Sequence, residues 1–173
     1  MFTLLKYQAN KEALREYFYN NFDKTQHHKT AGSEIFHWRK LFDIDEIAAP
    51  IVEELGLSGM NLMPRLSFQY RNTILGDHID IDRMIAVNLN LMDEPAVIHL
   101  NDVPYSYEAA LIDVGTIRHR VESIAKNRLV LKLAIREPWD KVYLALRDKY
   151  VMDRSLDSYE SILLPHDEKF VKL

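Results

Sequence analysis

A histidine and an aspartate stand two positions apart in the stretch GDHIDIDRMIAVNLNL, residues 76–91. Imidazole and carboxylate groups are ligands for borderline and hard metal ions. Side chains two positions apart on an extended chain point to the same side, so His78 and Asp80 could hold one ion. They could equally form a solvated polar turn before the apolar run, which is typical of a buried strand. The stretch alone leaves both interpretations open.

A third ligand has to come from elsewhere, and the surroundings of His119 favour it. This histidine follows the Gly-Thr turn of DVGTIRHRVES and stands at the expected start of another strand. Two histidines and one carboxylate form the facial triad that leaves positions open on a non-haem Fe(II) ion. A strand-end histidine bonded only to backbone is the alternative for His119, and Asp82 is an alternative to Asp80 as the carboxylate. The other histidines lie in less suitable contexts: His27, His28, His37, His99 and His166.

Arg128 stands nine positions after His119 and opens the strand-like segment RLVLKLAIR. A guanidinium group contacts a carboxylate through two parallel hydrogen bonds and stays charged when buried. Arg128 therefore suits the far carboxylate of a co-substrate that chelates the metal. Taken alone, an arginine in this position would more often pair with a surface acid.

The ordered set resembles the site pattern of the 2-oxoglutarate- and Fe(II)-dependent dioxygenases: His78-x-Asp80, then His119, then Arg128. The segment DVGTIRHRVESIAKNRLVLKLAI is most similar to the branch with aspartyl/asparaginyl β-hydroxylases and proline hydroxylases. There, the distal histidine is followed by a valine and then by an arginine on the last strand. The resemblance covers residues 65–136. It implies Fe(II) on the two histidines and the aspartate, 2-oxoglutarate chelating the iron, O2 in the remaining position, and Arg128 on the distal carboxylate.

The resemblance implies a hydroxylase that attacks an unactivated C–H bond of a small molecule or peptide, an amino-acid side chain above all. Succinate and CO2 would be released. The carboxylate at Asp80 favours hydroxylation, because related halogenases lack it and bind chloride in its place. The rival is a non-catalytic jelly-roll or cupin-like module that binds a ligand or a metal. Arg128 distinguishes the hydroxylase from the non-catalytic module, since such a module has no need of a buried cation opposite the site.

Polar side chains on neighbouring predicted strands are secondary candidates for contacts with the co-substrate or the substrate. They share strand faces as follows: Ser67, Gln69 and Arg71 on one strand, and Asn88 and Asn90 on the next. These faces could line the inside of a roll or lie on a solvated outer surface. Lys132 has the same strand parity as Arg128 and is an alternative partner for the co-substrate carboxylate.

The elements that must position these residues are expected to form one domain, residues 1–173. Its first part, residues 1–58, is predicted to be a mainly helical flank. NKEALREYFYNNF has helical apolar spacing behind a possible Asn10 cap, and DIDEIAAPIVEELGL repeats the pattern with Gly56 as a natural stop. Pro50 kinks the second helix or begins another short one.

Residues 59–137 are expected to be the β-roll core that carries the site. Apolar and polar residues alternate in RLSFQYR, MIAVNLNL and RLVLKLAIR, while AVIHL and YSYEAALIDV flank a hairpin loop, NDVP. Short strands with no helix between them exclude a parallel α/β sheet. Residues 138–173 add a helix, WDKVYLALRDKYV, and a tail. With the resemblance, the expected fold is mainly β with helical flanks: a double-stranded β-helix (jelly roll, cupin-like).

Composition narrows the class of protein further. Of the 173 residues, 47% are hydrophobic and 28% are charged, the balance of a globular domain. The formal net charge of −4 gives no general attraction to nucleic acid or to anionic membranes. No apolar stretch approaches the roughly 20 residues that span a bilayer. The N-terminus shows no secretory signal and the chain has no cysteine, so we expect a cytoplasmic protein whose metal ligands are His, Asp or Glu.

Overall fold

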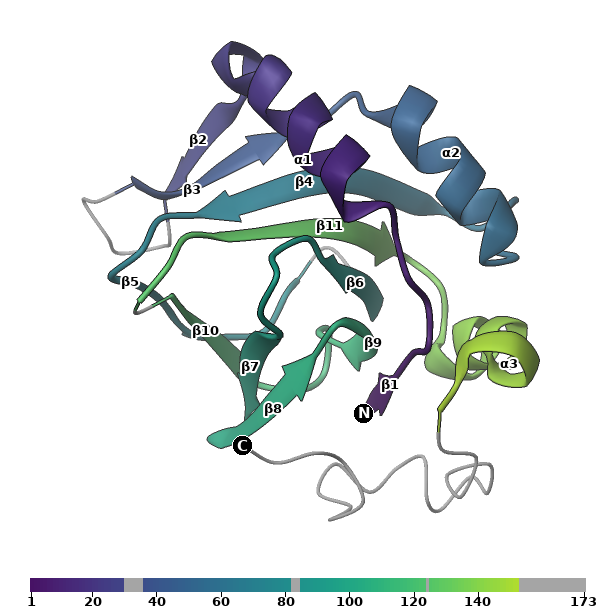
Figure 1. Ribbon diagram of the computed structural model, residues 1–173. Coiled ribbons are helices and arrows are strands. Elements are labelled where there is room, and N and C mark those ends of the chain that lie inside the picture. Colours follow the sequence, from purple (N-terminus) through teal and green to yellow (C-terminus); the bar gives the residue numbers. More distant parts are fainter. Residues whose placement is uncertain (30–35, 82–84, 124, 153–173) are drawn as a thin grey trace.

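The computed structural model describes residues 1–29, 36–81, 85–123 and 125–152 (Figure 1). Two antiparallel sheets face each other and form a double-stranded β-helix, the jelly-roll fold that the sequence predicts. The large sheet has, in spatial order, β1 (Phe2–Leu4), β9 (Ala109–Asp113), β6 (Ile85–Asn90), β11 (Arg128–Ile135), β4 (Leu62–Gln69), β3 (Phe36–Leu41) and β2 (Gln26–Lys29). The small sheet has β5 (Thr73–His78), β10 (His119–Ser123), β7 (Ala96–Leu100) and β8 (Val103–Tyr107).

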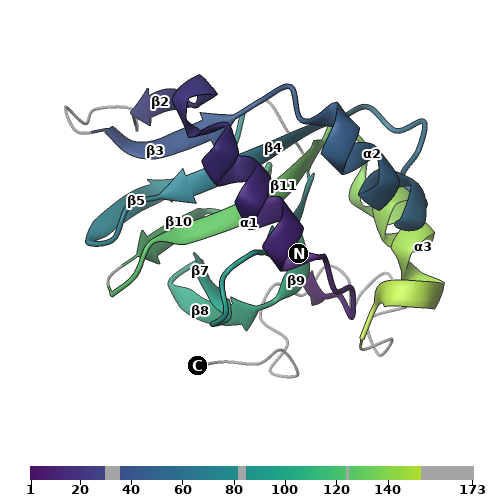
Figure 2. The ribbon, with the colours of Figure 1, turned by 45° about the horizontal axis from the view of Figure 1, so that its top comes forward.

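Three helices cover the outer face of the large sheet: α1 (Lys11–Asn20), α2 (Asp45–Glu54) and α3 (Trp139–Tyr150). A short 3-10 helix, Phe22–Lys24, follows α1. Figure 2 shows α2 and α3 side by side, and the Tyr150 hydroxyl donates to the Glu54 carbonyl oxygen at 2.7 Å. Among the described residues, none of the helices has the length and the apolar character of a membrane span.

Each central strand of the large sheet presents two different buried faces. On β11, Leu129, Leu131 and Leu133 pack into the core under the helices. The alternate residues, from Arg128 to Lys132, face the small sheet and are buried as well. Because side chains alternate across a strand, one face can be apolar while the other is polar. The helices therefore pack on one face of the large sheet, and the opposite face lines the inside of the roll.

The first helix begins, and the second helix ends, at the capping residue that the sequence predicts. Asn10 caps α1, since its side-chain oxygen accepts from the Ala13 N–H at 3.2 Å. Gly56 follows α2 with a φ of +72°, a left-handed conformation that suits glycine. The helix runs through Pro50 as one element, so a second helix does not begin there.

The prediction of a mainly helical flank at residues 1–58 is wrong in part. Three strands, β1, β2 and β3, also lie there and complete the large sheet. Their segments are short, and QHHK on β2 has no apolar alternation that could reveal a strand. β1 and β3 are defined by long-range pairing with β9 and β4, and β2 is defined by pairing with β3.

Two further boundaries differ from expectation. The segment YSYEAALIDV is not one strand: it divides at Glu108 into β8 and β9, which belong to different sheets. The NDVP hairpin turns on Asn101 and Asp102, both with positive φ, and the next strand already begins at Val103. Two successive positive φ values are typical of the tight hairpin turn that matches strand twist.

Candidate metal centre

The structure brings His78, Asp80 and His119 together at one end of the small sheet. One ligand atom from each lies within 4.8 Å of the others. The Nε2 atoms of His78 and His119 lie 3.6 and 3.5 Å from the two carboxylate oxygens of Asp80. In the part of the chain that the structure describes, this is the one cluster of its kind. Its donor set, two imidazoles and one carboxylate, suits a divalent metal ion.

Strand pairing explains why these residues meet although 41 positions separate the two histidines. His78 ends β5, His119 begins β10, and the two are directly paired across the small sheet. Asp80 follows β5, and its backbone N–H donates to the Val114 carbonyl oxygen at 2.9 Å. A bond to a neighbouring loop therefore fixes the carboxylate where the strand has already ended.

Backbone contacts orient both imidazole rings. Nδ1 of His78 lies 2.8 Å from the Gly76 carbonyl oxygen, and Nδ1 of His119 lies 3.0 Å from that of Ile117. A carbonyl oxygen only accepts, so the proton of each neutral ring sits on Nδ1. Nε2 keeps its lone pair and faces Asp80, which is the arrangement that metal-binding histidines use. The backbone bond of His119 thus supports the metal interpretation instead of replacing it.

The surroundings favour the deprotonated forms of two of the three residues, His78 and Asp80. Burial lowers the pKa of His78 below its ordinary value. Burial would raise the pKa of the Asp80 carboxyl, but the contact with His119 and the charge of Lys132 outweigh it, and the pKa lies below its usual value. Metal ions bind deprotonated ligands, so a carboxylate and a neutral imidazole are ready at neutral pH.

The inner face of the large sheet carries a row of buried polar side chains, which we call the polar wall. Its members are Arg65, Ser67 and Gln69 on β4, Asn88 and Asn90 on β6, and Arg128 and Lys132 on β11. The polar strand faces noted in the sequence therefore line the roll and are not solvated. Arg71 is the exception: it is exposed, past the end of β4, and does not reach the interior.

Arg128 lies within the polar wall with unused hydrogen-bond donors. Its side chain is 5% exposed, and its Nη2 donates to the Tyr107 hydroxyl. Its Nε and Nη1 have no hydrogen-bond partner among the described residues. Buried donors without partners cost free energy, so such an arrangement favours a ligand that accepts from them. The Tyr107 hydroxyl also accepts from Asn88 Nδ2 at 3.3 Å, which leaves its own proton available.

Two aromatic residues of the interior were not found from the sequence. Tyr107 alternates with Tyr105 on β8, and that period of two was the available signal. Trp38 lies on β3, in a zone that was predicted to be helical. Its ring centroid lies 6.0 Å from Arg128 Cζ and 5.6 Å from Lys132 Nζ, and its indole N–H has no partner within the described residues. Trp38 thus packs beside both cations.

Lys132 interacts electrostatically with the metal cluster. Its positive charge lowers the pKa of both His78 and Asp80. Burial, together with Arg65 and Arg128, lowers the pKa of Lys132 to about 7, against the opposing effect of Asp80. Burial of the charged form of this lysine therefore costs free energy.

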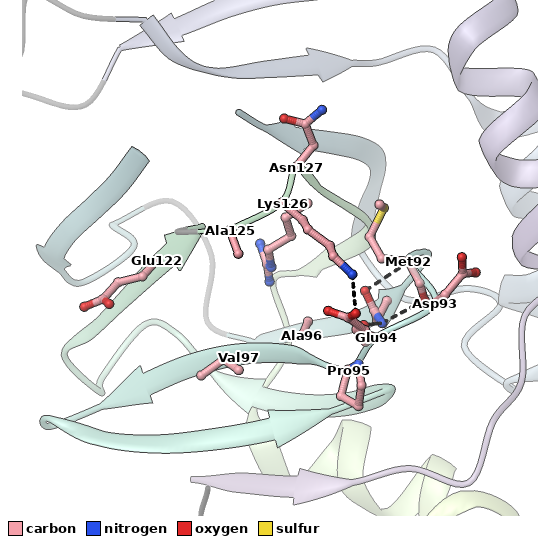
Figure 3. Close-up of a pocket in the computed structure, with 12 residues that line it drawn as sticks. Met92, Asp93, Glu94, Pro95, Ala96, Val97, Glu122, Ala125, Lys126 and Asn127 are labelled. Carbon is pink, nitrogen blue, oxygen red and sulfur yellow. Dashed lines mark hydrogen bonds and ion pairs between the residues drawn. The ribbon is translucent and has the colours of Figure 1, made fainter. Parts of the chain in front are cut away.

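A cavity of about 220 Å³ lies at the Arg128 end of the roll (Figure 3). The loop after β6 and the residues before β11 form its rim, where Lys126 reaches across to pair with Glu94. Arg128 is part of its lining, and none of the three cluster residues is. The roll therefore has an opening at the guanidinium group that is separate from the metal cluster.

The remaining sequence candidates lie elsewhere. His99 is on the outer face of the small sheet, where its Nδ1 contacts Arg120 at 3.1 Å. His27 is exposed and His28 is partly buried on β2. Asp82 and His166 lie outside the described residues, as does the tail.

Comparison with known proteins supports the fold. No family profile matches this chain, and no curated protein matches it in sequence. Among solved structures, a prolyl-4-hydroxylase from Pseudomonas putida is similar with a TM-score of 0.55 and 15% identity, over 74% of this chain and 86% of that one. The non-haem α-ketoglutarate-dependent epimerase SnoN of nogalamycin biosynthesis has a TM-score of 0.51 and 9% identity, over 77% and 75%. At such identities the likeness shows a shared fold.

The metal cluster predicts a clear difference between two histidine variants. His119→Ala should weaken Mn(II) binding about a hundredfold or more, because only two donors remain. His99→Ala is the matched control and should bind Mn(II) like the wild type, because its ring is on the outer face. Titration calorimetry measures both affinities. Equal affinities for the two variants would contradict the assignment.

The buried lysine predicts an unusual stability effect in the metal-free protein. Lys132→Met should raise the free energy of unfolding by about 1–4 kcal/mol at about pH 6, because it removes a charge buried beside other cations. The folded pKa of about 7 lies below the ordinary 10.5, so between these values the unfolded chain binds one more proton than the folded chain. Wild-type stability from this group therefore rises with pH across that range, and the gain from the substitution shrinks.

Denaturant unfolding at about pH 6 and about pH 9 measures this effect. Lys141→Met, on the exposed side of α3, is the control and should change little at either pH. A Lys132→Met protein that is less stable than the wild type at the lower pH would show that the lysine stabilises the empty fold.

Proposed function

We propose that this protein is an Fe(II)- and 2-oxoglutarate-dependent oxygenase that hydroxylates an unactivated C–H bond, with release of succinate and CO2. One observation carries the proposal: a buried arginine with unused donors lies inside the same roll as a two-histidine, one-carboxylate cluster. A metal-binding module without a co-substrate has no use for such a cation. The shared fold with a prolyl-4-hydroxylase and an α-ketoglutarate-dependent epimerase supports the proposal.

The residues present fit the metal. His78 and His119 would offer Nε2, and Asp80 would offer a carboxylate oxygen, in a donor set typical of non-haem Fe(II). When bound, Fe(II) with 2-oxoglutarate and O2 would supply the oxidising chemistry. The chain's own contribution is placement: backbone carbonyl groups hold the two rings, and the Val114 contact holds Asp80.

The residues at the other end of the polar wall fit the co-substrate. The free donors of Arg128 match the two oxygens of a carboxylate, and the Tyr107 hydroxyl can donate a further hydrogen bond to it. Trp38 lies beside Arg128, with its ring centroid 6.0 Å from Cζ. Lys132 is the alternative partner for this carboxylate. Arg128 is favoured because its donors lack partners and a second polar group stands next to it.

The proposed substrate is an amino-acid side chain, either free or in a peptide. The similarity of residues 113–135 to aspartyl/asparaginyl β-hydroxylases and proline hydroxylases supports this class. A cytoplasmic location is also proposed, and the lack of cysteine supports it.

The test of the function uses the protein, Fe(II) and 2-oxoglutarate without O2. A visible charge-transfer band should form, because the co-substrate chelates the iron, and admission of air should give succinate even without a prime substrate. His78→Ala should lose both signals, and His99→Ala should keep both. If the wild type gives neither a band nor succinate, the chain is a non-catalytic jelly-roll module.

A second variant separates the roles of the two ends of the roll. Arg128→Met should weaken 2-oxoglutarate binding about 10- to 100-fold, because a charged hydrogen-bonded contact is worth roughly 1.5–3 kcal/mol. Mn(II) affinity should stay within about twofold, because the cluster is untouched. Calorimetric titration of each ligand gives both values. A parallel loss of both affinities would mean that the substitution disturbs the fold instead of one contact.

A further inference from the structure

We propose that the cavity at the Arg128 end of the roll is the port through which the co-substrate, a dicarboxylate, enters and its product succinate leaves. The metal end is then left to the prime substrate. This inference rests on the proposed function and gives each of the two organic ligands a route of its own. The ion pair between Lys126 and Glu94 closes the mouth of the port.

The cavity lies between the two sheets of the roll. From the large sheet, Asn90 and Arg128 line it, and both belong to the polar wall. From the small sheet, Ala96 lines it, and this residue is buried in the same apolar cluster as Tyr107 and Trp38. The cavity, about 220 Å³ in volume, therefore reaches the inner faces of both sheets. A ligand that enters here arrives directly at the guanidinium group.

The metal cluster is reached from a different place. None of its three residues lines the cavity. The side chain of His78 is 26% exposed and that of Asp80 is 12% exposed, so solvent reaches the cluster itself. The described part of the chain thus offers access at the cation and, separately, at the metal. A prime substrate bound at the metal would leave the cavity open for exchange of the co-substrate.

The charges of the lining favour an anionic ligand. Its three acids each have a cationic partner: Asp93 pairs with Arg15 at 2.7 Å, Glu122 with Arg120 at 3.0 Å, and Glu94 with Lys126. Arg128 donates instead to an uncharged hydroxyl, and two of its nitrogens have no partner among the described residues. The lining therefore holds one buried cation for which a ligand can supply the carboxylate.

The ion pair at the mouth is suited to opening. Lys126 and Glu94 are 63% and 68% exposed, and they meet across the rim of the cavity (Figure 3). Exposed ion pairs are worth little, so a carboxylate from solution can replace Glu94 on the ammonium group. The loop itself stays in place, because Asn90 Nδ2 donates to the Glu94 carbonyl oxygen at 2.7 Å. Lys126 and then Arg128 would contact the entering carboxylate in turn.

The experiment follows the visible band of Fe(II) with 2-oxoglutarate in a stopped-flow instrument without O2, and measures the rates of association and dissociation. Glu94→Gln should raise both rates about two- to fivefold, the scale on which an exposed ion pair acts. The dissociation constant should stay within about twofold, because a port affects entry and exit alike. Glu137→Gln, which breaks the ion pair with Lys141 on α3, is the matched control and should change neither rate.

A cross-link across the mouth should have the opposite effect. The chain has no cysteine, so Glu94→Cys combined with Lys126→Cys can be joined selectively by a short bis-maleimide. The joined protein should bind and release 2-oxoglutarate about tenfold more slowly or less, with the dissociation constant again within about twofold. Glu137→Cys combined with Lys141→Cys, joined in the same way, controls for the linker and should keep the wild-type rates.

Wild-type rates in the protein that is cross-linked across the mouth would overturn the inference, because the co-substrate would then enter at the metal end. A changed dissociation constant without matching changes in both rates would also overturn it, since the ion pair would then belong to the bound site. A wild type that forms no band removes the proposed function, and this inference with it. A band whose rates are the same in both mouth variants removes the inference alone.

Discussion

The burial of positive charge inside the roll is the constraint on which the rest of the structure depends. Arg65, Arg128 and Lys132 sit on one face of the large sheet, and their burial costs several kcal/mol for each ion before compensation. The opposite face of the same strands must therefore contribute a large apolar core. Leucines of β11 and the three helices form that core. The helical layer thus stabilises a sheet whose inner face is kept for polar contacts.

The metal cluster is held by a different device, the pairing of β5 with β10. That pairing sets His78 against His119, and carbonyl oxygens two residues before each ring hold its Nδ1 side. Asp80 is fixed by one backbone bond outside the strand. Nδ1 of each ring is therefore used for orientation, and Nε2 of each ring faces the carboxylate of Asp80. The small sheet, which carries the cluster, and the inner face of the large sheet, which carries the cations, line one interior, where the proposed metal and co-substrate would meet.

Much of this arrangement could be predicted from the sequence, because alternation and ordered motifs are local signals. The segment of β11 showed its period of two, and His78, Asp80, His119 and Arg128 were identified before the structure placed them in one roll. Alternation does not show whether a polar strand face points into the roll or to solvent. The sequence therefore left the location of the polar wall open. Trp38 was missed because β3 is defined by its pairing with β4, and Tyr107 because its contact with Arg128 crosses between sheets.

A crystal structure of the protein with Mn(II) and 2-oxoglutarate, grown without O2, tests the central claim most directly. It should show the ion on Nε2 of both histidines and on a carboxylate oxygen of Asp80. The distal carboxylate of 2-oxoglutarate should lie against the guanidinium of Arg128 and the Tyr107 hydroxyl. An ion bound elsewhere, or a co-substrate carboxylate that contacts Lys132 and leaves Arg128 without a ligand, would contradict the account.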